Sequence, residues 1–405
     1  MATEKKQRAF ERVGIAAGLM GADGHWRSTI FEEMSALAHR YGALNLGQGF
    51  PDTDGPAEML DAAAQALADG VNQYATIAGN PALRQAIAEH QQRFYGLTLD
   101  PDTQVTVTAG ASEALAATIA ALVEPGDEVI LFEPYYDLYP AAAALAGARV
   151  RTVPLVPPSF EPDLDALESA FSDRTALVVV NDPHNPTGAV FSVEAKTKIV
   201  ELATKFNAVI LADQVYEHLV FDGPYQPIQT LPGAAERTVA VSAISKTHSA
   251  TGWRVGWMTG PADLILPIRL VKGYFTHSAA APLQAAAAIG VGLGDDFYSG
   301  VKERYAQQRQ VLVENLAGSP WAVTPPAGTF FAVADVSQVL AEQGLKSAEE
   351  LCQRLPAQAG VALIPLTAFT TESYRQQVET YVRFAFCKRP EVLQDAAAHL
   401  RAYSG

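Results

Sequence analysis

The segment TVAVSAISKTHSATGWRVGWMTG, residues 238–260, contains two short apolar runs separated by a polar stretch. The runs Thr238–Ser242 and Arg254–Gly260 are bounded by polar or turn residues, which predicts two β-strands. The stretch between them is rich in small and hydroxyl side chains and contains a single lysine, Lys246. Open α/β sheets bind ligands where their strands end, so Lys246 is a candidate functional residue.

The alternation of apolar runs and helical stretches continues on the N-terminal side of this segment, from about residue 60. Four further runs predict strands at Gln104–Ala109, Glu128–Phe132, Ala176–Asn181 and Ala208–Asp213. Helical patterns between them predict crossover helices at Ser112–Val123, Pro140–Gly147 and Val193–Phe206. Strands that alternate with helices argue for βαβ units, so the predicted fold class is α/β with a mostly parallel sheet.

The length of 405 residues predicts two domains, because single domains usually hold ~100–200 residues. Residues 56–295 carry the alternating pattern and are expected to form the large domain. Residues 296–405 begin with a long polar helical pattern and end in a strand-like and a helix-like stretch, which predicts a smaller α+β domain. Residues 1–55 are expected to contribute to that smaller domain.

Composition and charge argue against several classes of protein. A net charge of −15, without a long Lys/Arg run, argues against a nucleic-acid partner. The first residues, MATEKKQRAFERVG, contain no apolar signal core, and no stretch approaches the ~20 apolar residues of a membrane span. We therefore expect a cytoplasmic protein that is neither exported nor embedded in a membrane.

The cysteines and histidines show no ligand spacing. Cys352 and Cys387 are the only cysteines, and the eight histidines are scattered along the chain, so no disulfide framework and no metal site is predicted. The run GVGLG, residues 290–294, lacks the preceding strand and the spacing of a dinucleotide-binding loop. A helix C-cap explains it better, and a nicotinamide dehydrogenase is not predicted.

The segment TAGASEAL, residues 108–115, leads from a predicted strand through Gly110 into a helix. The amides at the start of such a helix, at Ala111 and Ser112, can bind a phosphate. A plain tight turn is the alternative interpretation.

Two further strand ends carry polar side chains. In NDPHNPTG, residues 181–188, Asn185 lies between prolines, where its amide can be held toward a ligand; a loop stabilised by Asx turns is the alternative. In ILADQVY, residues 210–216, Asp213 ends an apolar strand, and a carboxylate buried there needs a cationic partner. Capping of a helix is the commoner role of such an aspartate.

The cations also allow two interpretations. A nucleophilic lysine must offer a neutral amine, which burial and positively charged neighbours favour by lowering its pKa. Arg254, eight positions after Lys246, is a candidate for such a neighbour. An isolated lysine, however, is usually a solvated surface charge. In YVRFAFCK, residues 381–388, Arg383 lies in a predicted strand, where its guanidinium can bind a carboxylate bidentately or form a surface ion pair.

Taken together, these motifs resemble those of the class I, fold type I, pyridoxal-phosphate-dependent aminotransferases, in the same order and from about Ile30 to Lys388. The stretches NLGQGFPD, residues 45–52, and EPYYDLY, residues 133–139, look most like the kynurenine, glutamine and methionine aminotransferases. Bacterial enzymes assigned to N-succinyldiaminopimelate transamination look equally close. The resemblance implies a large domain with a mostly parallel seven-stranded sheet and a smaller α+β domain.

The resemblance also implies a role for each matching residue. Lys246 would carry pyridoxal phosphate as a Schiff base and act as the catalytic base. The remaining cofactor contacts would come from Gly110, Ala111, Ser112, Tyr136, Asn185, Asp213, Tyr216 and Arg254. Among these, Asp213 pairs with the pyridine nitrogen, Tyr216 and Asn185 reach the ring oxygen, Tyr136 stacks on the ring and Arg254 holds the phosphate. Gly49, Asn185 and Arg383 would bind the substrate carboxylate.

Tyr74 resembles the tyrosine that reaches the phosphate of the neighbouring subunit, which implies a homodimer with shared active sites. The implied reaction is ping-pong transamination between an L-amino acid, of the kynurenine, methionine or glutamine type, and a 2-oxo acid. N-succinyldiaminopimelate transamination and β-elimination from cysteine conjugates are the alternatives. A DNA-binding regulator is disfavoured, since no separate DNA-binding module is present in the sequence.

Three positions depart from the family pattern. Gln214 stands where relatives usually have a glutamate, and Ala243 where many have a phosphate-binding serine. Ser242 or Ser245 could substitute for that serine. His277 falls where relatives often place an aromatic or variable side chain, and no arginine is there to select an acidic substrate.

Overall fold

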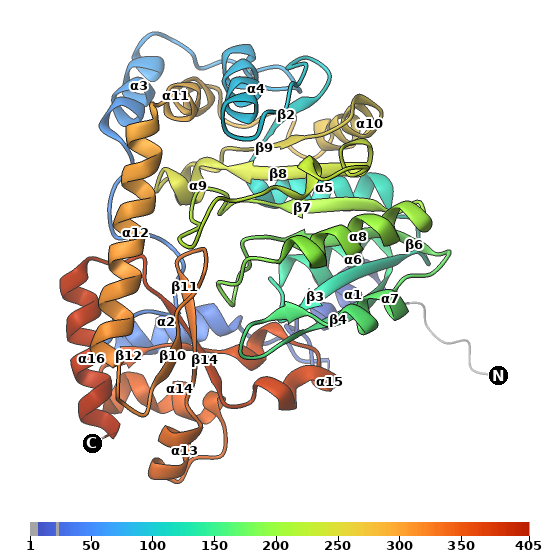
Figure 1. Cartoon of the computed structure of the whole chain (residues 1–405). Coiled ribbons are helices and arrows are strands. Elements are labelled where there is room, and N and C mark those ends of the chain that lie inside the picture. The colour runs from blue at the N-terminus through green and yellow to red at the C-terminus, as the bar shows by residue number, and fades with distance from the viewer. Residues whose placement is uncertain (1–6, 22–23, 405) are drawn as a thin grey trace.

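The computed structural model describes residues 7–21 and 24–404, and its main feature is an eight-stranded sheet (Figure 1). In spatial order the strands are β2 (Val105–Thr108), β9 (Gly256–Thr259), β8 (Thr238–Ala243), β7 (Val209–Asp213), β6 (Thr175–Asn181), β3 (Glu128–Glu133), β4 (Arg149–Val156) and β5 (Glu161–Pro162). The pairs between β8 and β4 are parallel, whereas β9 runs antiparallel to both of its neighbours. The predicted mostly parallel sheet is therefore confirmed.

The six strands predicted from the sequence are all present, with ends shifted by one or two residues. The start of β9 differs because Arg254 has a φ of 54°, which places it outside the strand. The resemblance implied seven strands, and the eighth is the two-residue β5, which pairs only with the end of β4.

Strand β4 has no counterpart among the strands predicted from the residues themselves. Its first half alternates exposed arginines, Arg149 and Arg151, with half-buried residues, and Pro154 lies inside it. Proline is tolerated near the edge of a sheet, where one neighbour suffices. A charged strand with an internal proline does not produce an apolar run, so the pattern search missed it.

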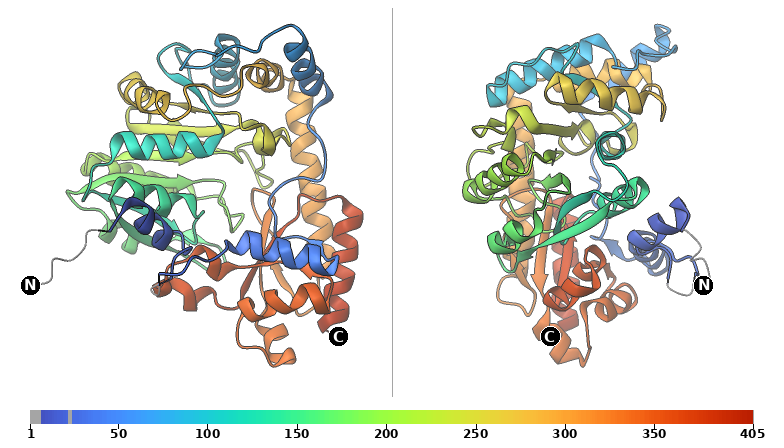
Figure 2. Two further views of the ribbon diagram at one scale, coloured as in Figure 1. Left: turned by 180° about the vertical axis from the view of Figure 1, so that it is seen from behind. Right: turned by 90° about the vertical axis from the view of Figure 1, so that its right-hand side faces the viewer.

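Helices cover both faces of this sheet (Figure 2). On one face lie α5 (Ala111–Leu122) and α6 (Leu138–Ala146), and on the other lie α7 (Leu164–Ala170) and α8 (Val193–Lys205). The three predicted crossover helices correspond to α5, α6 and α8, and the Ser192 side chain caps α8 by accepting from Ala195 N. Beside the β2 edge pack α3 (Ala57–Ala68), α4 (Pro81–Tyr95), α10 (Ala262–Gly273) and α11 (Ala281–Val291).

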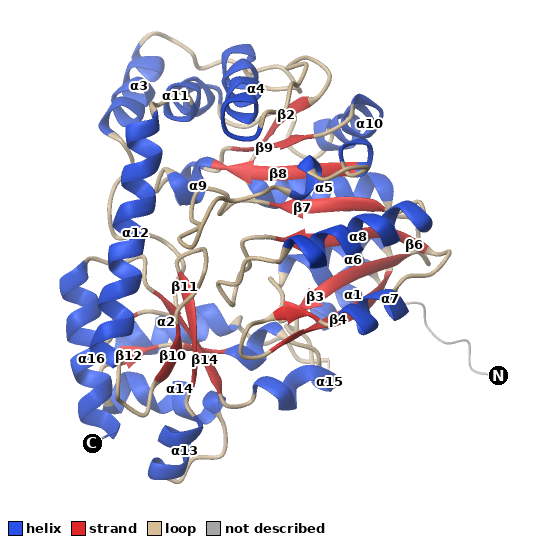
Figure 3. Ribbon diagram, in the orientation of Figure 1, coloured by secondary structure: helices blue, strands red, loops and turns tan. Residues whose placement is uncertain are grey.

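A second group of elements contains a smaller antiparallel sheet (Figure 3). Its strands are β10 (Ala322–Thr324), β11 (Phe331–Asp335), β14 (Tyr381–Ala385) and β13 (Ile364–Pro365), and a parallel pair joins β1 (Leu44–Asn45) to β12 (Val361–Ala362). Around them lie α2 (Ile30–Tyr41), α13 (Ser337–Gln343), α14 (Ala348–Gln358), α15 (Glu372–Arg375) and α16 (Pro390–Ser404). The long α12 (Asp295–Leu316) packs against α16 and β10.

The N-terminal segment contacts both groups of elements. Helix α2 packs on α14 and β12, whereas α1 (Ala9–Ala16) packs on α6, where Arg12 donates hydrogen bonds to the carbonyls of Ala144 and Leu145. The domain limits at residues 55/56 and 295/296 stay predictions. No helix in the described part of the chain is long and apolar enough to span a membrane.

Candidate active site

The carboxyl ends of β2, β6, β7 and β8 meet at one edge of the large sheet and surround a cavity of about 150 Å³. Asn181 and Asp213 are paired in register at the ends of β6 and β7, and Lys246 lies on the short α9 (Ile244–Thr247) that follows β8. The lining includes eight of the predicted residues, namely Ala111, Ser112, Tyr136, Asn185, Asp213, Tyr216, Lys246 and Arg254. Positions more than 100 residues apart in the chain therefore converge as the topology requires.

Asp213 is a buried carboxylate held by hydrogen bonds. Its Oδ2 accepts from the Tyr139 hydroxyl at 2.7 Å, and the Asn181 amide donates to its backbone carbonyl at 3.1 Å. Burial raises the pKa of Asp213, and no salt bridge joins it to a cation among the described residues. A cationic ligand group next to Asp213 would lower that pKa and stabilise the carboxylate.

Lys246 presents its amine to the same cavity. The Nζ atom donates to the Gly49 carbonyl at 3.2 Å and lies 5.6 Å from the centre of the Tyr216 ring. Burial lowers the pKa of Lys246 to about 8, and nearby Arg383 and Arg254 act in the same direction against the opposing effect of Asp213. Near neutral pH a larger fraction of this amine is uncharged than of an ordinary lysine, which is the condition for a nucleophile or base.

The start of α5 and Arg254 form one corner of the cavity. Gly110 has a φ of 78°, and a Cβ atom built there would lie 2.6 Å from Nη2 of Arg254, so the close approach of the guanidinium requires glycine. The guanidinium donates to the Ser112 hydroxyl at 3.2 Å. No side chain caps α5, and its first amides are open to an anion together with Arg254.

The two serines beside Ala243 differ in direction. The Ser242 hydroxyl donates to Oε1 of Glu217 at 2.5 Å, away from the cavity, whereas Ser245 lines the cavity. Of the two possible substitutes for the missing serine, the geometry favours Ser245.

Arg383 lies on β14, across the gap between the two sheets. Its guanidinium donates to the Asn185 side chain at 3.0 Å and to the Gly47 carbonyl at 2.8 Å, while Nε has no hydrogen-bond partner among the described residues. The ring centres of Phe331 and Phe369 lie 4.2 and 4.7 Å from it, and burial lowers the pKa of Arg383 to about 10. This stacked guanidinium is oriented for a planar anion.

Gly49 contributes space as well as a carbonyl oxygen. A Cβ atom built at Gly49 would lie 2.5 Å from the Phe331 ring, so a larger residue would displace the ring that stacks on Arg383.

One predicted residue lies apart from the others. Tyr74 is 87% exposed and packs edge-on against His277, with 5.2 Å between the ring centres. It does not line the cavity of its own chain. This position fits a residue that acts on another subunit, and that role stays a prediction.

Gln214 is matched to a neutral partner. Its amide donates to the Gln229 side chain at 2.7 Å and accepts from it at 3.0 Å, and both side chains are buried. A glutamate at position 214 would lose the donor half of this pair. The glutamine at position 214, where relatives usually have a glutamate, is thus held by a reciprocal pair of hydrogen bonds with Gln229.

A wider basin of about 1100 Å³ lies between the N-terminal segment, α2 and the C-terminal elements. It does not include Lys246 or Asp213, but its wall contains Phe31, whose ring centre is 5.5 Å from the Arg383 guanidinium. Its lining carries both signs of charge, from Arg27, Arg40, Arg375, Glu32, Glu33, Asp137 and Glu349. The basin adjoins the site on the side of Arg383.

Sequence reasoning missed Tyr139 and Asn181, the two residues that hold Asp213. Tyr139 stands three residues after Tyr136, a spacing that places both side chains on the same side of a helical turn, and Asn181 is the last residue of a predicted strand. Both signals were present in the sequence. The contacts with Asp213 depend on how Tyr139 of α6 and Asn181 of β6 meet the end of β7 in three dimensions, which was not visible there.

Comparison with known proteins places these residues in a family context. The family model described as aminotransferase class I and II matches residues 41–400. A probable N-succinyldiaminopimelate aminotransferase of Mycobacterium tuberculosis is 44% identical over 93% of this chain and 96% of that protein. The methionine aminotransferase of Escherichia coli is 40% identical over 92% of this chain and 95% of its own length. The solved structure of the Mycobacterium tuberculosis N-succinyldiaminopimelate aminotransferase superposes with a TM-score of 0.89, covering 93% of this chain and 97% of the other.

Proposed function

This chain belongs to the class I and II aminotransferase family, and from that premise we propose that its donor is an L-amino acid of the kynurenine, methionine or glutamine type. The protein is an aminotransferase of fold type I, and its cofactor is pyridoxal phosphate. The amino group passes to a 2-oxo acid in two half-reactions with ping-pong kinetics. The observation that carries the transamination chemistry is that the Lys246 amine and the buried Asp213 carboxylate face one cavity.

The residues present fit pyridoxal phosphate. The uncapped start of α5, Ser112 and Arg254 form an anion site of the kind that binds a phosphate group. Asp213 has a raised pKa, as expected of a buried carboxylate that awaits a cationic partner such as a protonated ring nitrogen. Lys246 has the partly uncharged amine that a covalent link to an aldehyde requires.

We assign roles to the chain's residues on this basis. When bound, pyridoxal phosphate supplies an electron sink for the charge that develops at the α-carbon of the amino acid. Asp213, fixed by Tyr139, keeps the ring nitrogen protonated. The remaining contacts are assigned as follows: Tyr216 and Asn185 to the ring oxygen, Tyr136 to the ring face, and Gly110, Ala111, Ser112 and Arg254 to the phosphate, joined by Tyr74 of a second subunit.

Arg383 and Lys246 act on the substrate. The Arg383 guanidinium, together with Asn185 and Gly49, binds the α-carboxylate and thereby orients the bond from Cα to its hydrogen. The Lys246 amine would act as the general base that removes the α-proton of the bound amino acid. Its depressed pKa leaves it free to accept a proton near neutral pH.

N-succinyldiaminopimelate is a second candidate donor, favoured by the wide basin beside Arg383. A longer amino acid with additional carboxylates would extend into this basin, where Arg27 and Arg40 are available as anion partners. The 44% identity to the probable N-succinyldiaminopimelate aminotransferase supports the same candidate.

The experiment that tests the donor is a comparison of single half-reactions. The purified holoenzyme is mixed, without an acceptor, with kynurenine, methionine, glutamine, glutamate or N-succinyldiaminopimelate, and the cofactor absorbance is followed. We expect the first three donors to convert the cofactor faster than glutamate, because no arginine replaces His277 to bind an acidic side chain. Conversion by N-succinyldiaminopimelate alone would overturn this choice in favour of the second candidate.

A matched variant separates the two candidates further. Arg40→Gln should weaken the reaction of N-succinyldiaminopimelate more than that of methionine, since methionine has no carboxylate beyond the α-carboxylate for Arg40 to bind. Pyruvate and ammonia formed from a cysteine conjugate without an acceptor would instead indicate β-elimination.

We further propose a homodimer with shared active sites. Large apolar side chains are exposed around α10 and in the loop between α3 and α4. A surface that exposes such a group of apolar side chains is typical of protein–protein contacts. The side chains are Tyr74, Ile77, Leu270, Tyr274 and Phe275, and Ile77 lies against the end of α10 at Gly273. A second copy of this chain would cover them and bring Tyr74 to the neighbouring Arg254.

The shared site predicts complementation between two defective chains. Lys246→Ala and Tyr74→Ala chains, each inactive or weak alone, should regain about a quarter of the wild-type activity when co-expressed, because random pairing restores one of four sites. Steady-state activity of the unfractionated mixture, per total protein, measures this. Activity of the mixture no greater than the mean of the two separate variants would contradict the shared site.

We place the reaction in a reducing compartment, the cytoplasm. Cys352 and Cys387 are both free and buried, and burial raises the pKa of each thiol. Protonated buried thiols react slowly, and the protein needs no oxidising environment for its two cysteines.

A further inference from the structure

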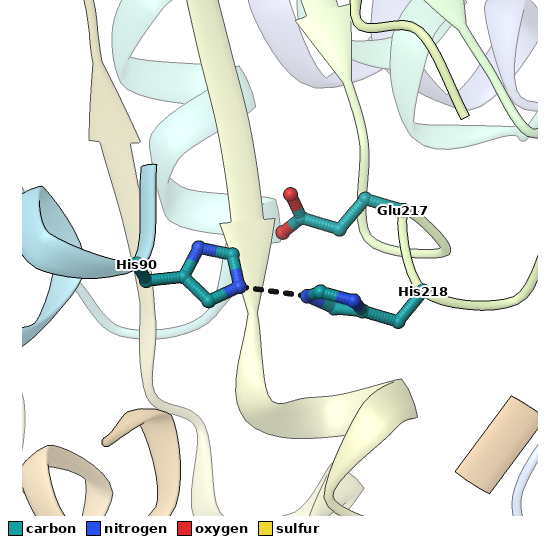
Figure 4. A group of neighbouring side chains, drawn as sticks. All are labelled: His90, Glu217 and His218. Carbon is teal, nitrogen blue, oxygen red and sulfur yellow. Dashed lines mark hydrogen bonds between the residues drawn. The ribbon is translucent and has the colours of Figure 1, made fainter. Parts of the chain in front are cut away.

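A cluster of potential metal ligands lies beside the active site but outside its cavity (Figure 4). It consists of His90 on α4 and of Glu217 and His218 in the loop after β7. One ligand atom from each residue lies within 4.8 Å of the others. Because His90 precedes His218 by 128 residues, no ligand spacing in the sequence indicated this group.

The two imidazoles face each other as neutral groups. Their Nε2 atoms are 2.7 Å apart, and the Gln91 amide lies 3.3 Å from Nδ1 of His90. Burial lowers the pKa of His90 to about 3 and that of His218 well below its usual value. Neutral imidazoles offer the lone pairs that a metal ion needs, and the proton that one Nε2 donates to the other must move to Nδ1 when an ion binds both.

Glu217 is the buried acidic member of the set. Its Oε1 accepts from Ser242, and the Tyr95 hydroxyl and the Gln91 side chain lie close enough to its carboxylate to lower its pKa against the effect of burial. Burial raises the pKa of Glu217 to about 7. A bound cation would stabilise this buried carboxylate in its charged form.

A simple hydrogen bond between the two histidines explains only part of this arrangement. If Gln91 donates to Nδ1 of His90, then Nε2 of His90 carries the proton and donates it to His218. That network satisfies the imidazoles, while Ser242, Tyr95 and Gln91 surround the Glu217 carboxylate. It is the competing interpretation that an experiment must separate from metal binding.

We propose that His90, Glu217 and His218 bind one divalent transition-metal ion of the zinc class. Two imidazole nitrogens and one carboxylate oxygen form a three-ligand set that leaves a fourth position for water, and imidazoles do not suit calcium or magnesium. A cavity of about 10 Å³ beside the three residues, also lined by Ser242 and His248, has room for roughly one water molecule.

Binding needs a small change in geometry. Two nitrogens on one tetrahedral zinc ion lie about 3.3 Å apart, more than the 2.7 Å between the present Nε2 atoms. His218 is the least buried member of the set, and its ring, which packs on Phe94 and Tyr298, would have to shift by a few tenths of an ångström.

The role of such an ion would be to position the active site. It joins α4 to the loop that follows Asp213 and Tyr216, and through Glu217 and Ser242 it reaches the end of β8 before Lys246. The lining of the small cavity shares no residue with that of the cofactor cavity. The ion would therefore stabilise the strand ends without touching the substrate.

The test is direct metal binding by the holoenzyme after treatment with a chelator. Cobalt(II) is added first, its absorption bands are recorded, and zinc(II) is then used to displace it, with the bound metal counted after dialysis. We expect one ion per chain, cobalt bands typical of tetrahedral nitrogen and oxygen ligands, and an unfolding temperature about 2 °C or more higher with zinc.

Variants identify the ligands. Glu217→Gln and His218→Gln should each lose the ion and the cobalt bands, while His399→Gln, a change of an exposed histidine, should keep both. If the Glu217 variant does not fold, His218→Gln still decides, because His218 is the least buried of the three residues. Substoichiometric metal with an unchanged unfolding temperature, or binding that survives in both variants, would overturn the proposal. None of these measurements depends on transaminase activity.

Discussion

The Lys246→Ala variant is expected to lose at least about 10⁴-fold in the rate of multiple turnover, because one residue supplies both the covalent link to the cofactor and the general base. No other lysine lines the cavity of the described structure, so no neighbouring amine can take over. Steady-state transamination with the fastest donor measures the loss. The absorbance of the bound cofactor reports separately on the missing covalent link.

The fold around this lysine should survive the substitution. The Lys246 amine makes one hydrogen bond, to the Gly49 carbonyl, and its removal leaves a space that water can enter from the open cavity. Lys302→Ala, a change of a surface lysine that donates to the Gly223 carbonyl, is the control and should keep wild-type rates. Multiple turnover that persists in the Lys246 variant would show that another residue carries the chemistry.

The sequence predicts the parts of this site that depend on local pattern. Strands β7 and β8 end where apolar runs stop, and Asp213 and Lys246 follow from those ends together with the family resemblance. The start of α5 follows from the strand, glycine and helix order at Gly110. Strand β4 was not predicted because Arg149 and Arg151 interrupt the apolar run that indicates a buried strand.

Contacts between distant segments were beyond the same reasoning. The hydrogen bond from Tyr139 to Asp213 and the choice between Ser242 and Ser245 depend on how helices and strands pack in three dimensions. The reciprocal amides of Gln214 and Gln229 are 15 residues apart, with no periodic pattern that links them. Local propensity and spacing carry no information about which buried polar groups will meet.

The Asp213→Asn variant is expected to lose about 10²- to 10³-fold in kcat/KM, which is the cost of leaving a buried cation without its partner charge. Asparagine has nearly the same shape and can still accept from Tyr139, so the change isolates the charge. Steady-state kinetics and the cofactor dissociation constant measure the effect. A loss below about tenfold would mean that Asp213 does not pair with a charged cofactor nitrogen.

Tyr139→Phe tests whether Asp213 needs its hydrogen-bond donor. Removing one hydrogen bond to a charged acceptor costs about 1.5–3 kcal/mol, so a loss of about 10- to 100-fold is expected. Because Tyr139 acts through Asp213, the double variant should be little worse than Asp213→Asn alone. Strictly additive losses would assign Tyr139 an independent role. Non-additive losses would support a single unit, in which Tyr139 orients the Asp213 carboxylate and that carboxylate stabilises the protonated cofactor nitrogen.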